Sequence, residues 1–233
     1  MDNRDEIKEW KKAQCADPLS KRLAIKKMQR RRWSARITQL LTEGFRTLCS
    51  KMVSFFWPFQ GQFDPRFAIH QIRKHGGTAP LPVVSRKGSP LKFREWRPGV
   101  RVSKDVFDLP VPEGTAVVRP QAMLIPPVGI DSRGYRLGYG RGYFDRTLTI
   151  LRPQPLKISA AFELSWIATI QPQPYDVPMD FIVTEPGIHF VSRDALVCLR
   201  DPGETIELSG RIMRNRDCSS NQSEKSTAGL ESK

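Results

Sequence analysis

The chain has 233 residues, of which 39% are hydrophobic and 27% charged, a composition typical of one soluble globular domain with polar extensions. It contains no run of about 18 apolar residues, which excludes a transmembrane helix, and we expect no membrane partner. The four cysteines are far apart and form no CxxC pair, which argues against a zinc site. We therefore expect free thiols and a cytoplasmic protein, since the first residues also lack the apolar core of a secretory signal.

The formal net charge of +14 is unevenly distributed along the chain. Residues 21–36 (KRLAIKKMQRRRWSAR) hold eight Lys or Arg and no acidic residue. This stretch is either a solvated helix face or a surface that attracts an anionic ligand or a polynucleotide. No RNA-binding motif with interleaved aromatic residues accompanies the charge, so we do not expect a nucleic-acid partner.

The predicted elements begin with a polar N-terminal segment, residues 1–18, which ends at the helix-breaking pair Asp17-Pro18. An interrupted helical stretch follows to about Ser50, because apolar residues recur there at helical spacing. Further helices are predicted at 64–75 and 143–151. Strands are predicted at 51–59, 80–84, 91–96, 122–130, 157–162, 181–184 and 189–192, and residues 98–120 are predicted to be a loop.

Strands that alternate with helices are typical of a parallel sheet with both faces covered. We therefore predict a single α/β domain over residues 19–210, a three-layer α/β/α arrangement with a mainly parallel sheet. From residue 211 the sequence becomes rich in Arg, Asn, Ser, Glu and Lys without apolar spacing. Residues 211–233 are therefore predicted to be a disordered polar tail.

The stretch GYRLGYGRGYFDR, residues 134–146, places four glycines between a predicted buried strand and a helix. In an open α/β sheet this is the carboxyl end of a strand, where ligands bind. Glycines leave backbone N–H groups accessible, and the following helix N-terminus favours an anion. The arginines of the stretch suit phosphate oxygens, and its single acidic residue, Asp145, suits magnesium. The pattern indicates a phosphate-binding loop, with a tight strand-to-helix turn as the alternative.

The sequence IPPVGIDSRGYRLGYGRGYFDRTL closely resembles the signature of the 5-formyltetrahydrofolate cyclo-ligase family, an apolar strand followed by D-x-x-G-x-R-L-G-x-G-x-G-[YF]-[YF]-D-R. Three further stretches resemble segments of this family: LPVV at 81–84, LKFREWRPG at 91–99, and PQPYDVPMDFIVTEPG at 172–187. The resemblance covers about residues 10–192. It implies an enzyme that uses ATP and magnesium to convert 5-formyltetrahydrofolate to 5,10-methenyltetrahydrofolate, after phosphorylation of the formyl oxygen.

The resemblance also implies roles for individual residues. The phosphates of ATP would be bound by the following residues: Lys11, Arg136, Leu137, Gly138, Tyr139, Gly140, Arg141, Gly142, Tyr143 and Phe144. The reduced folate would contact Gln62 and the segment Tyr139, Gly140, Arg141, Gly142 and Tyr143. Asp145 and Asp176 would be the magnesium ligands, and the catalytic residues would be Arg136, Tyr143 and Asp145.

Two positions depart from the family pattern on the folate side. The family usually has a Lys, an Arg and a second Arg at the spacing that gives Lys11, Cys15 and Arg22 here, so the middle Arg is a cysteine; nearby Lys26 or Arg30 could substitute. The family Glu that helps to hold the folate is Gln62, which lacks the negative charge. These changes leave an alternative open: a family paralogue that binds nucleotide, with or without folate, and lacks cyclo-ligase activity.

Overall fold

The structure, a computed structural model, describes residues 3–228 of the chain. Its helices are α1 (Asn3–Gln14), α2 (Ala16–Ala24), α3 (Lys27–Gly44), η1 (Arg46–Ser50), α4 (Arg66–Lys74), α5 (Tyr143–Ile150), η2 (Glu163–Ser165) and α6 (Pro202–Ala228), where η marks a 3-10 helix. Its strands are β1 (Val53–Ser54), β2 (Ala79–Val83), β3 (Lys92–Trp96), β4 (Val102–Lys104), β5 (Pro110–Pro112), β6 (Val117–Val118), β7 (Ala122–Ile125), β8 (Gly129–Ile130), β9 (Arg136–Leu137), β10 (Leu156–Ala160), β11 (Phe181–Val183), β12 (Ile188–Val191) and β13 (Leu196–Leu199).

The main sheet has six strands in the order β1-β7-β10-β11-β12-β13. The first four strands run parallel, and β12 and β13 close one edge as an antiparallel hairpin. A second, three-stranded antiparallel sheet is formed by β2, β3 and β6. The predicted class, a single α/β domain with a mainly parallel sheet, is confirmed.

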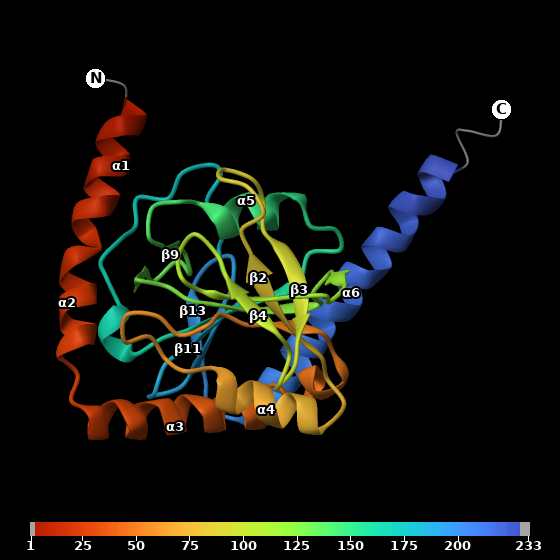
Figure 1. The fold of residues 1–233 in the computed structure, drawn as a ribbon, viewed down its shortest axis with the longest axis horizontal. Helices are drawn as coiled ribbons and strands as arrows, with labels where there is room; N and C mark the ends of the chain where they lie inside the picture. The colour runs from red at the N-terminus through yellow and green to blue at the C-terminus, as the bar shows by residue number, and fades with distance from the viewer. Residues whose placement is uncertain (1–2, 229–233) are drawn as a thin grey trace.

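The residues of β7 show why the main sheet is covered on both faces. Ala122 and Leu124 join the core cluster to which α3, α4 and α6 contribute, whereas Met123 and Ile125 join a second cluster that contains Leu148 of α5. Because alternate strand residues point to opposite faces, a strand that is apolar at every position must be buried on both sides. The three layers follow from this pattern. In Figure 1, α3 and α4 lie at one end of the molecule and α5 at the other.

The sequence predicts that the pair Asp17-Pro18 breaks a helix, and this prediction is wrong. Residues 3–14 form α1, and Asp17 and Pro18 lie in the first turn of α2. Proline lacks an N–H group, but the first turn of a helix needs none, and an acidic residue there is favourable. The pair therefore begins a helix, and α1 and α2 follow each other along one side of the molecule (Figure 1).

The prediction of a disordered tail is also wrong for residues 211–228, because α6 continues through them to Ala228. Its helical course is supported by tertiary contacts that composition does not reveal. Met213 is buried in the main core cluster, and Arg216 forms an ion pair with Asp180 at 2.7 Å. In Figure 1 the far end of α6 extends away from the body of the molecule. The remaining residues of the predicted tail, 229–233, lie outside the described part of the chain.

Two smaller differences concern the strands. The stretch 51–59 is a strand only at Val53–Ser54, and the expected loop 98–120 contains three short strands, β4, β5 and β6. The β4–β5 pair is antiparallel, and β4 is exposed along its length. Its sequence therefore has no alternating apolar pattern from which a strand could be predicted. Within residues 3–228, no helix is long and apolar enough to cross a membrane.

Candidate active site

The glycine-rich loop lies where the sequence predicts it, between the main sheet and α5. After β7 the chain forms a two-stranded ribbon, β8 with β9, and then runs through Gly138–Gly142 into the first turn of α5. Gly140 and Gly142 have φ angles of +77° and +59°, which other residues adopt only under strain. Gly142 is the N-cap of α5, so the loop delivers bare backbone to a helix N-terminus.

Arg136 and Asp145 form an ion pair beneath this loop. Nη2 of Arg136 lies 2.9 Å from Oδ2 of Asp145, and the arginine side chain is only 4% exposed. The guanidinium also lies over the Phe144 ring, with Cζ 5.0 Å from the ring centroid, while its Nε is buried and has no hydrogen-bond partner. A buried donor without an acceptor is costly, so an incoming anion would satisfy it.

Lys11 and Asp176 bring two distant segments to the same place. Nζ of Lys11 lies 2.6 Å from Oδ2 of Asp176, and that oxygen also accepts the N–H of Gln173 at 2.7 Å. One residue further on, the N–H of Val177 is 3.5 Å from Oδ1 of Asp145. The structure thus places the Asp145 carboxylate beside the residue that follows Asp176, and each of these two predicted magnesium ligands has a cation beside it.

The donor set fits a magnesium ion that is shared with phosphate. Among the described residues, no group of three or more His, Cys, Asp or Glu side chains could hold a metal ion by itself. Magnesium does not require such a group, because it is commonly bound through one or two carboxylates, waters and the phosphates of a substrate. Asp145 and Asp176 could supply the carboxylates, and the buried Nε of Arg136, which has no partner in the structure, is consistent with an anion nearby.

Arg141 and Tyr143 lie on the side of the loop that faces the turn between β4 and β5. Cζ of Arg141 is 4.3 Å from the centroid of the Phe107 ring, and the Tyr143 ring is 6.2 Å from the same ring. Arg146 contacts both of these residues. Its Nη2 donates to the carbonyl of Arg141 at 2.6 Å, and its Cζ lies 5.2 Å from the centroid of the Tyr143 ring. Phe107 was missed from the sequence because it lies in the segment predicted as loop.

Gln62, the predicted folate contact, is buried and supports the backbone near it. Its Oε1 accepts the N–H of Phe59 at 3.1 Å, and only 8% of the residue is exposed. The Phe59 ring is 45% exposed and pairs with the Tyr139 ring of the loop at 6.2 Å. Gln62 therefore supports the backbone that carries one ring of this aromatic pair.

Cys15, at the position where the resemblance implies an arginine, faces the loop without carrying a charge. Its Sγ lies 3.5 Å from the carbonyl oxygen of Gly138 and 3.3 Å from that of Lys11. Burial raises the pKa of the thiol above its ordinary value, with Arg22 opposing that shift, so the group stays neutral. Arg30 does not substitute, because its Nη2 donates to the carbonyls of Arg22 and Ile25. Lys26 is exposed on the surface.

The sequence of the chain matches a known protein family. A sequence model of the 5-formyltetrahydrofolate cyclo-ligase family matches residues 7–185. The chain belongs to this family. The match includes Lys11, the glycine-rich loop and Asp176, and it ends before α6 begins.

Two curated relatives are similar over part of their length. A 5-formyltetrahydrofolate cyclo-ligase of Mycoplasma pneumoniae is 40% identical over 62 residues, which cover 27% of this chain and 37% of that protein. One of Mycolicibacterium smegmatis is 28% identical over 118 residues, 47% of this chain and 60% of that protein. The chain thus matches less than two thirds of each of these relatives.

The likeness in structure is more extensive. The NMR structure of Aquifex aeolicus 5,10-methenyltetrahydrofolate synthetase superposes with a TM-score of 0.68 and 25% sequence identity. The superposition covers 84% of this chain and 97% of that one, so nearly the whole of the solved domain has a counterpart here.

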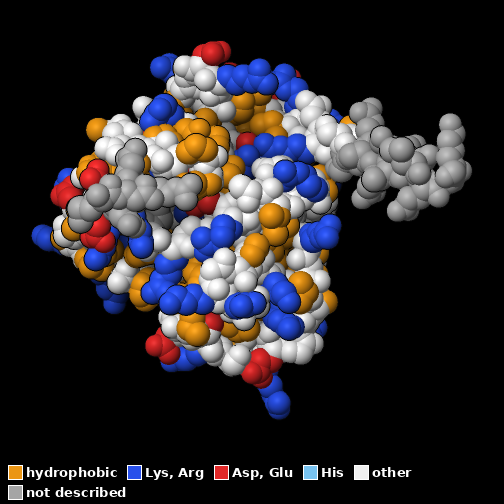
Figure 2. Space-filling model, turned by 90° about the horizontal axis from the view of Figure 1, so that it is seen from above, with side chains coloured by type: hydrophobic (Ala, Val, Ile, Leu, Met, Phe, Trp, Pro, Cys, Tyr) orange, Lys and Arg blue, Asp and Glu red, His pale blue; other side chains and the backbone are white. Residues whose placement is uncertain are grey.

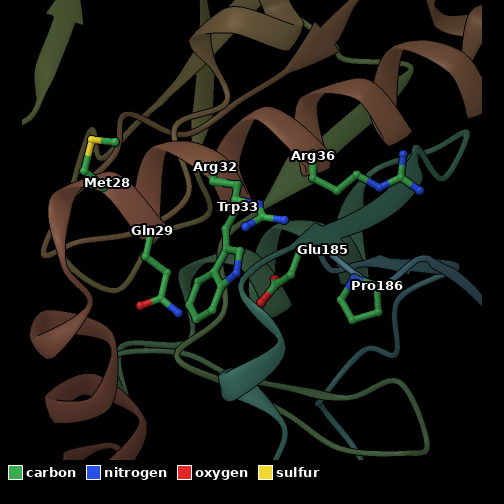
Figure 3. A pocket seen from close by; sticks show the side chains of 7 residues that line it. All are labelled: Met28, Gln29, Arg32, Trp33, Arg36, Glu185 and Pro186. Atoms are coloured by element: carbon green, nitrogen blue, oxygen red, sulfur yellow. The ribbon is translucent and has the colours of Figure 1, made fainter.

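In this cyclo-ligase family member, an open depression lies apart from the glycine-rich loop. It has a volume of about 800 Å³ and lies between α3 and the turn after β11, and Figure 3 shows its side chains. They are Met28, Gln29, Arg32, Trp33, Arg36, Glu185 and Pro186. None of them belongs to residues 134–146, so the depression is separate from the predicted phosphate and magnesium positions.

Figure 2 looks onto the end of the molecule where α5 lies, and Lys and Arg side chains far outnumber Asp and Glu on it. Such a surface attracts anionic substrates by its general field. Asp180 has a structural role apart from the ion pairs of the glycine-rich loop, because its partners are Lys157 and Arg216. It pairs with Lys157 at 3.2 Å and with Arg216 at 2.7 Å, and so holds α6 against the sheet.

Proposed function

We propose that this protein is an ATP- and magnesium-dependent 5-formyltetrahydrofolate cyclo-ligase that produces 5,10-methenyltetrahydrofolate. Membership of the family and the likeness to a methenyltetrahydrofolate synthetase over most of the chain support the reaction class. The observation that carries the proposal is the convergence of two cation–carboxylate pairs, Arg136–Asp145 and Lys11–Asp176, beside the glycine-rich loop.

These residues suit phosphoryl transfer, in which the protein mainly positions phosphates and balances their charge. Bound ATP would supply the phosphoryl group that turns the formyl oxygen into a leaving group. Arg136 and Lys11 would bind phosphate oxygens, and the bare N–H groups of Gly140 and Gly142 would add neutral donors. Asp145 and Asp176, released from their cations, would hold the magnesium ion that accompanies the phosphates.

The folate would lie on the opposite side of the loop, along Tyr139–Tyr143 and near Gln62. Tyr139 and Phe59 offer exposed aromatic rings there, and aromatic rings stack on flat heterocycles. Gln62 is buried and accepts the N–H of Phe59, so in this chain it would act through the backbone of residues 59–62 more than through a charge.

The test is an absorbance assay for methenyltetrahydrofolate with purified protein, 5-formyltetrahydrofolate, ATP and magnesium, and with ATP or magnesium omitted in parallel. Product that forms only when both are present supports the proposal. No product from a folded protein would rule it out as written. A separate titration of ATP·Mg binding then distinguishes the second candidate from a protein of another function.

That second candidate is a paralogue that binds nucleotide without closing the folate ring. The neutral thiol of Cys15 beside Gly138 favours it, because an arginine at that position would contribute a charge that this chain lacks. Nucleotide binding without turnover would support this candidate. The cytoplasmic location and the absence of a nucleic-acid partner stay predictions.

A further inference from the structure

Arg22 is an almost completely buried cation whose three donor nitrogens reach three different segments. Only 2% of the residue is exposed, although α2 lies on the surface of the molecule. Its Nε donates to the carbonyl of Gln60 at 3.0 Å, its Nη1 to the carbonyl of Pro127 at 3.1 Å, and its Nη2 to the hydroxyl of Tyr139 at 2.7 Å. Buried guanidinium groups are retained where such a fork of donors is fully used.

The three acceptors of Arg22 belong to the parts that build the folate side of the proposed site. Gln60 lies in the turn between Phe59 and Gln62, Pro127 precedes β8, and Tyr139 lies in the glycine-rich loop. Arg22 pairs with no carboxylate among the described residues, and each of its three nitrogens donates to a neutral acceptor, so it organises these neighbours. Its carbonyl in turn accepts from Arg30, which fixes the end of α2.

The Tyr139 hydroxyl has one clear task in this arrangement. Its ring is 42% exposed and Phe59 is 45% exposed, and the two rings meet edge-on with centroids 6.2 Å apart and an angle of 65°. Exposed aromatic side chains are ordinarily mobile and contribute little, unless another group fixes their orientation. Arg22 holds the Tyr139 ring directly through its hydroxyl, and it holds the backbone next to Phe59 through the carbonyl of Gln60.

We propose that Arg22 is a positioning residue for folate binding, which holds the Tyr139 and Phe59 rings as one preformed wall for the flat heteroaromatic part of the substrate. This inference rests on the proposed function. Position 139 is a free position of the family signature, L-G-x-G-x-G, so the wall is a feature of this chain's own residues. The guanidinium of Arg22 hydrogen-bonds to groups of the protein, and it affects the substrate by holding Tyr139 in place.

Tyr139→Phe is the decisive variant, because it keeps the ring and removes only the hydroxyl that Arg22 contacts. We expect the KM for 5-formyltetrahydrofolate to rise about tenfold, the loss that corresponds to one charge-assisted hydrogen bond. The kcat and the KM for ATP should stay within about twofold, since the loop would bind phosphate through its backbone N–H groups, which the loss of the Tyr139 hydroxyl leaves in place. A merely structural role would lower kcat or weaken both substrates together, and that result would overturn the proposal.

Arg22→Gln, Arg22→Lys and the double variant Arg22→Gln/Tyr139→Phe complete the test. The lysine keeps the charge but has one donor nitrogen in place of three, so its folate KM should lie between those of the wild type and the glutamine variant. The double variant should match Arg22→Gln alone, because the second change removes a contact that is already lost. Additive losses would overturn the inference. Lys21→Gln, which removes one charge from an exposed neighbour on α2, is the matched control and should leave the folate KM unchanged.

Direct titration of wild-type protein with 5-formyltetrahydrofolate distinguishes a failure of the proposed function from a failure of the inference about Arg22. If the wild type neither binds nor converts the reduced folate, the proposed function fails and this inference fails with it. If the wild type does so and Tyr139→Phe does not differ from it, only the inference fails. Should Arg22→Gln not fold, Tyr139→Phe still decides the matter by the same readout.

Discussion

Lys11 and Asp176 are separated by 165 positions in the sequence, yet Lys11 Nζ and Asp176 Oδ2 lie 2.6 Å apart. Both side chains are largely buried, at 16% and 10% exposed. The contact makes α1 a part of the candidate active site, and it joins the first helix to the segment that precedes β11.

Lys11→Ala should weaken the use of ATP with little effect on the fold. The amine is expected to bind a phosphate oxygen, and its loss leaves the Asp176 carboxylate without a cation. We expect the KM for ATP to rise about tenfold or more, in line with the loss of one charged contact. Lys12→Ala is the matched control, because that neighbouring amine is 79% exposed and pairs only loosely with Glu9. Equal effects of the two variants would contradict the assignment of Lys11.

Asp145→Asn should abolish most of the magnesium-dependent turnover. The amide keeps the size of the carboxylate but removes the charge that a metal ion needs, and we expect a loss of at least about a hundredfold in kcat. It also leaves the buried Arg136 guanidinium without its ion-pair partner, so the free energy of unfolding should fall by about 3 kcal/mol.

Urea unfolding and initial rates at several magnesium concentrations measure the two effects of Asp145→Asn separately. Asp108→Asn is a suitable control, since its carboxylate is 84% exposed and pairs with Lys104. Full activity of Asp145→Asn would show that the metal assignment is wrong.

Gln62→Glu should strengthen folate binding if the missing carboxylate limits this site. The change is compatible with the fold, because a carboxylate accepts the N–H of Phe59 at least as well as the amide oxygen does. We expect the Kd for 5-formyltetrahydrofolate to fall several-fold, about the effect of one charged hydrogen bond. A titration of both proteins with the folate measures this, and an unchanged Kd would remove the lost charge as an explanation.

His189 gives the stability of the protein a pH dependence of predictable sign. Burial lowers the pKa of this imidazole below its ordinary value of 6.5, against a smaller opposing effect of Glu163, and its Nδ1 is buried without a partner. The unfolded chain therefore binds a proton near pH 6.5 that the folded protein does not bind. The free energy of unfolding should fall as the pH drops below that value, until the lowered pKa is reached, with a slope below about 1.4 kcal/mol per pH unit.

The measurement is a series of urea melts between pH 5 and pH 8 for the wild type and His189→Gln. The difference between the two curves isolates His189, because Glu185, whose pKa burial raises above 4.5, contributes equally to both. Glu185 acts in the opposite direction, stabilising the fold as it takes up a proton at low pH. Parallel curves for the two proteins would exclude His189 as the source of the dependence.

The sequence predicts the glycine-rich loop well because its signals are local. A buried strand, glycines that require positive φ angles and a helix start all lie within residues 122–150, and each is specified by its near neighbours. The same reasoning correctly places α4 between Pro65 and His75. Local rules also explain the error at Asp17-Pro18, since proline ends one helix and begins another with equal ease, and only the surrounding fold decides.

The rest of the site depends on contacts that no local pattern encodes. Arg22 is one of eight basic residues in a stretch that looks uniformly solvated, and neither charge nor periodicity distinguishes it as a buried residue from exposed Lys21 or Lys26. Its burial follows from where α2 packs against the turn at Gln60 and the loop at Tyr139. The helical state of residues 211–228 was missed for the same reason, because its anchor, Asp180, lies about 30 residues upstream.

The last helix, α6, adds tertiary contacts that stabilise the part of the chain matched by the family model. The family match ends at residue 185, while α6 begins at Pro202, and yet Met213 lies in the main core and Arg216 contacts both oxygens of Asp180. Asp180 in turn accepts the N–H of Lys157 on the neighbouring strand β10. A chain shortened to the segment shared with its relatives would therefore uncover apolar core and leave a carboxylate and an ammonium group to balance each other at the sheet. For anyone who trims this protein for crystallography or expression, the boundary of the homology is not the boundary of the folded unit.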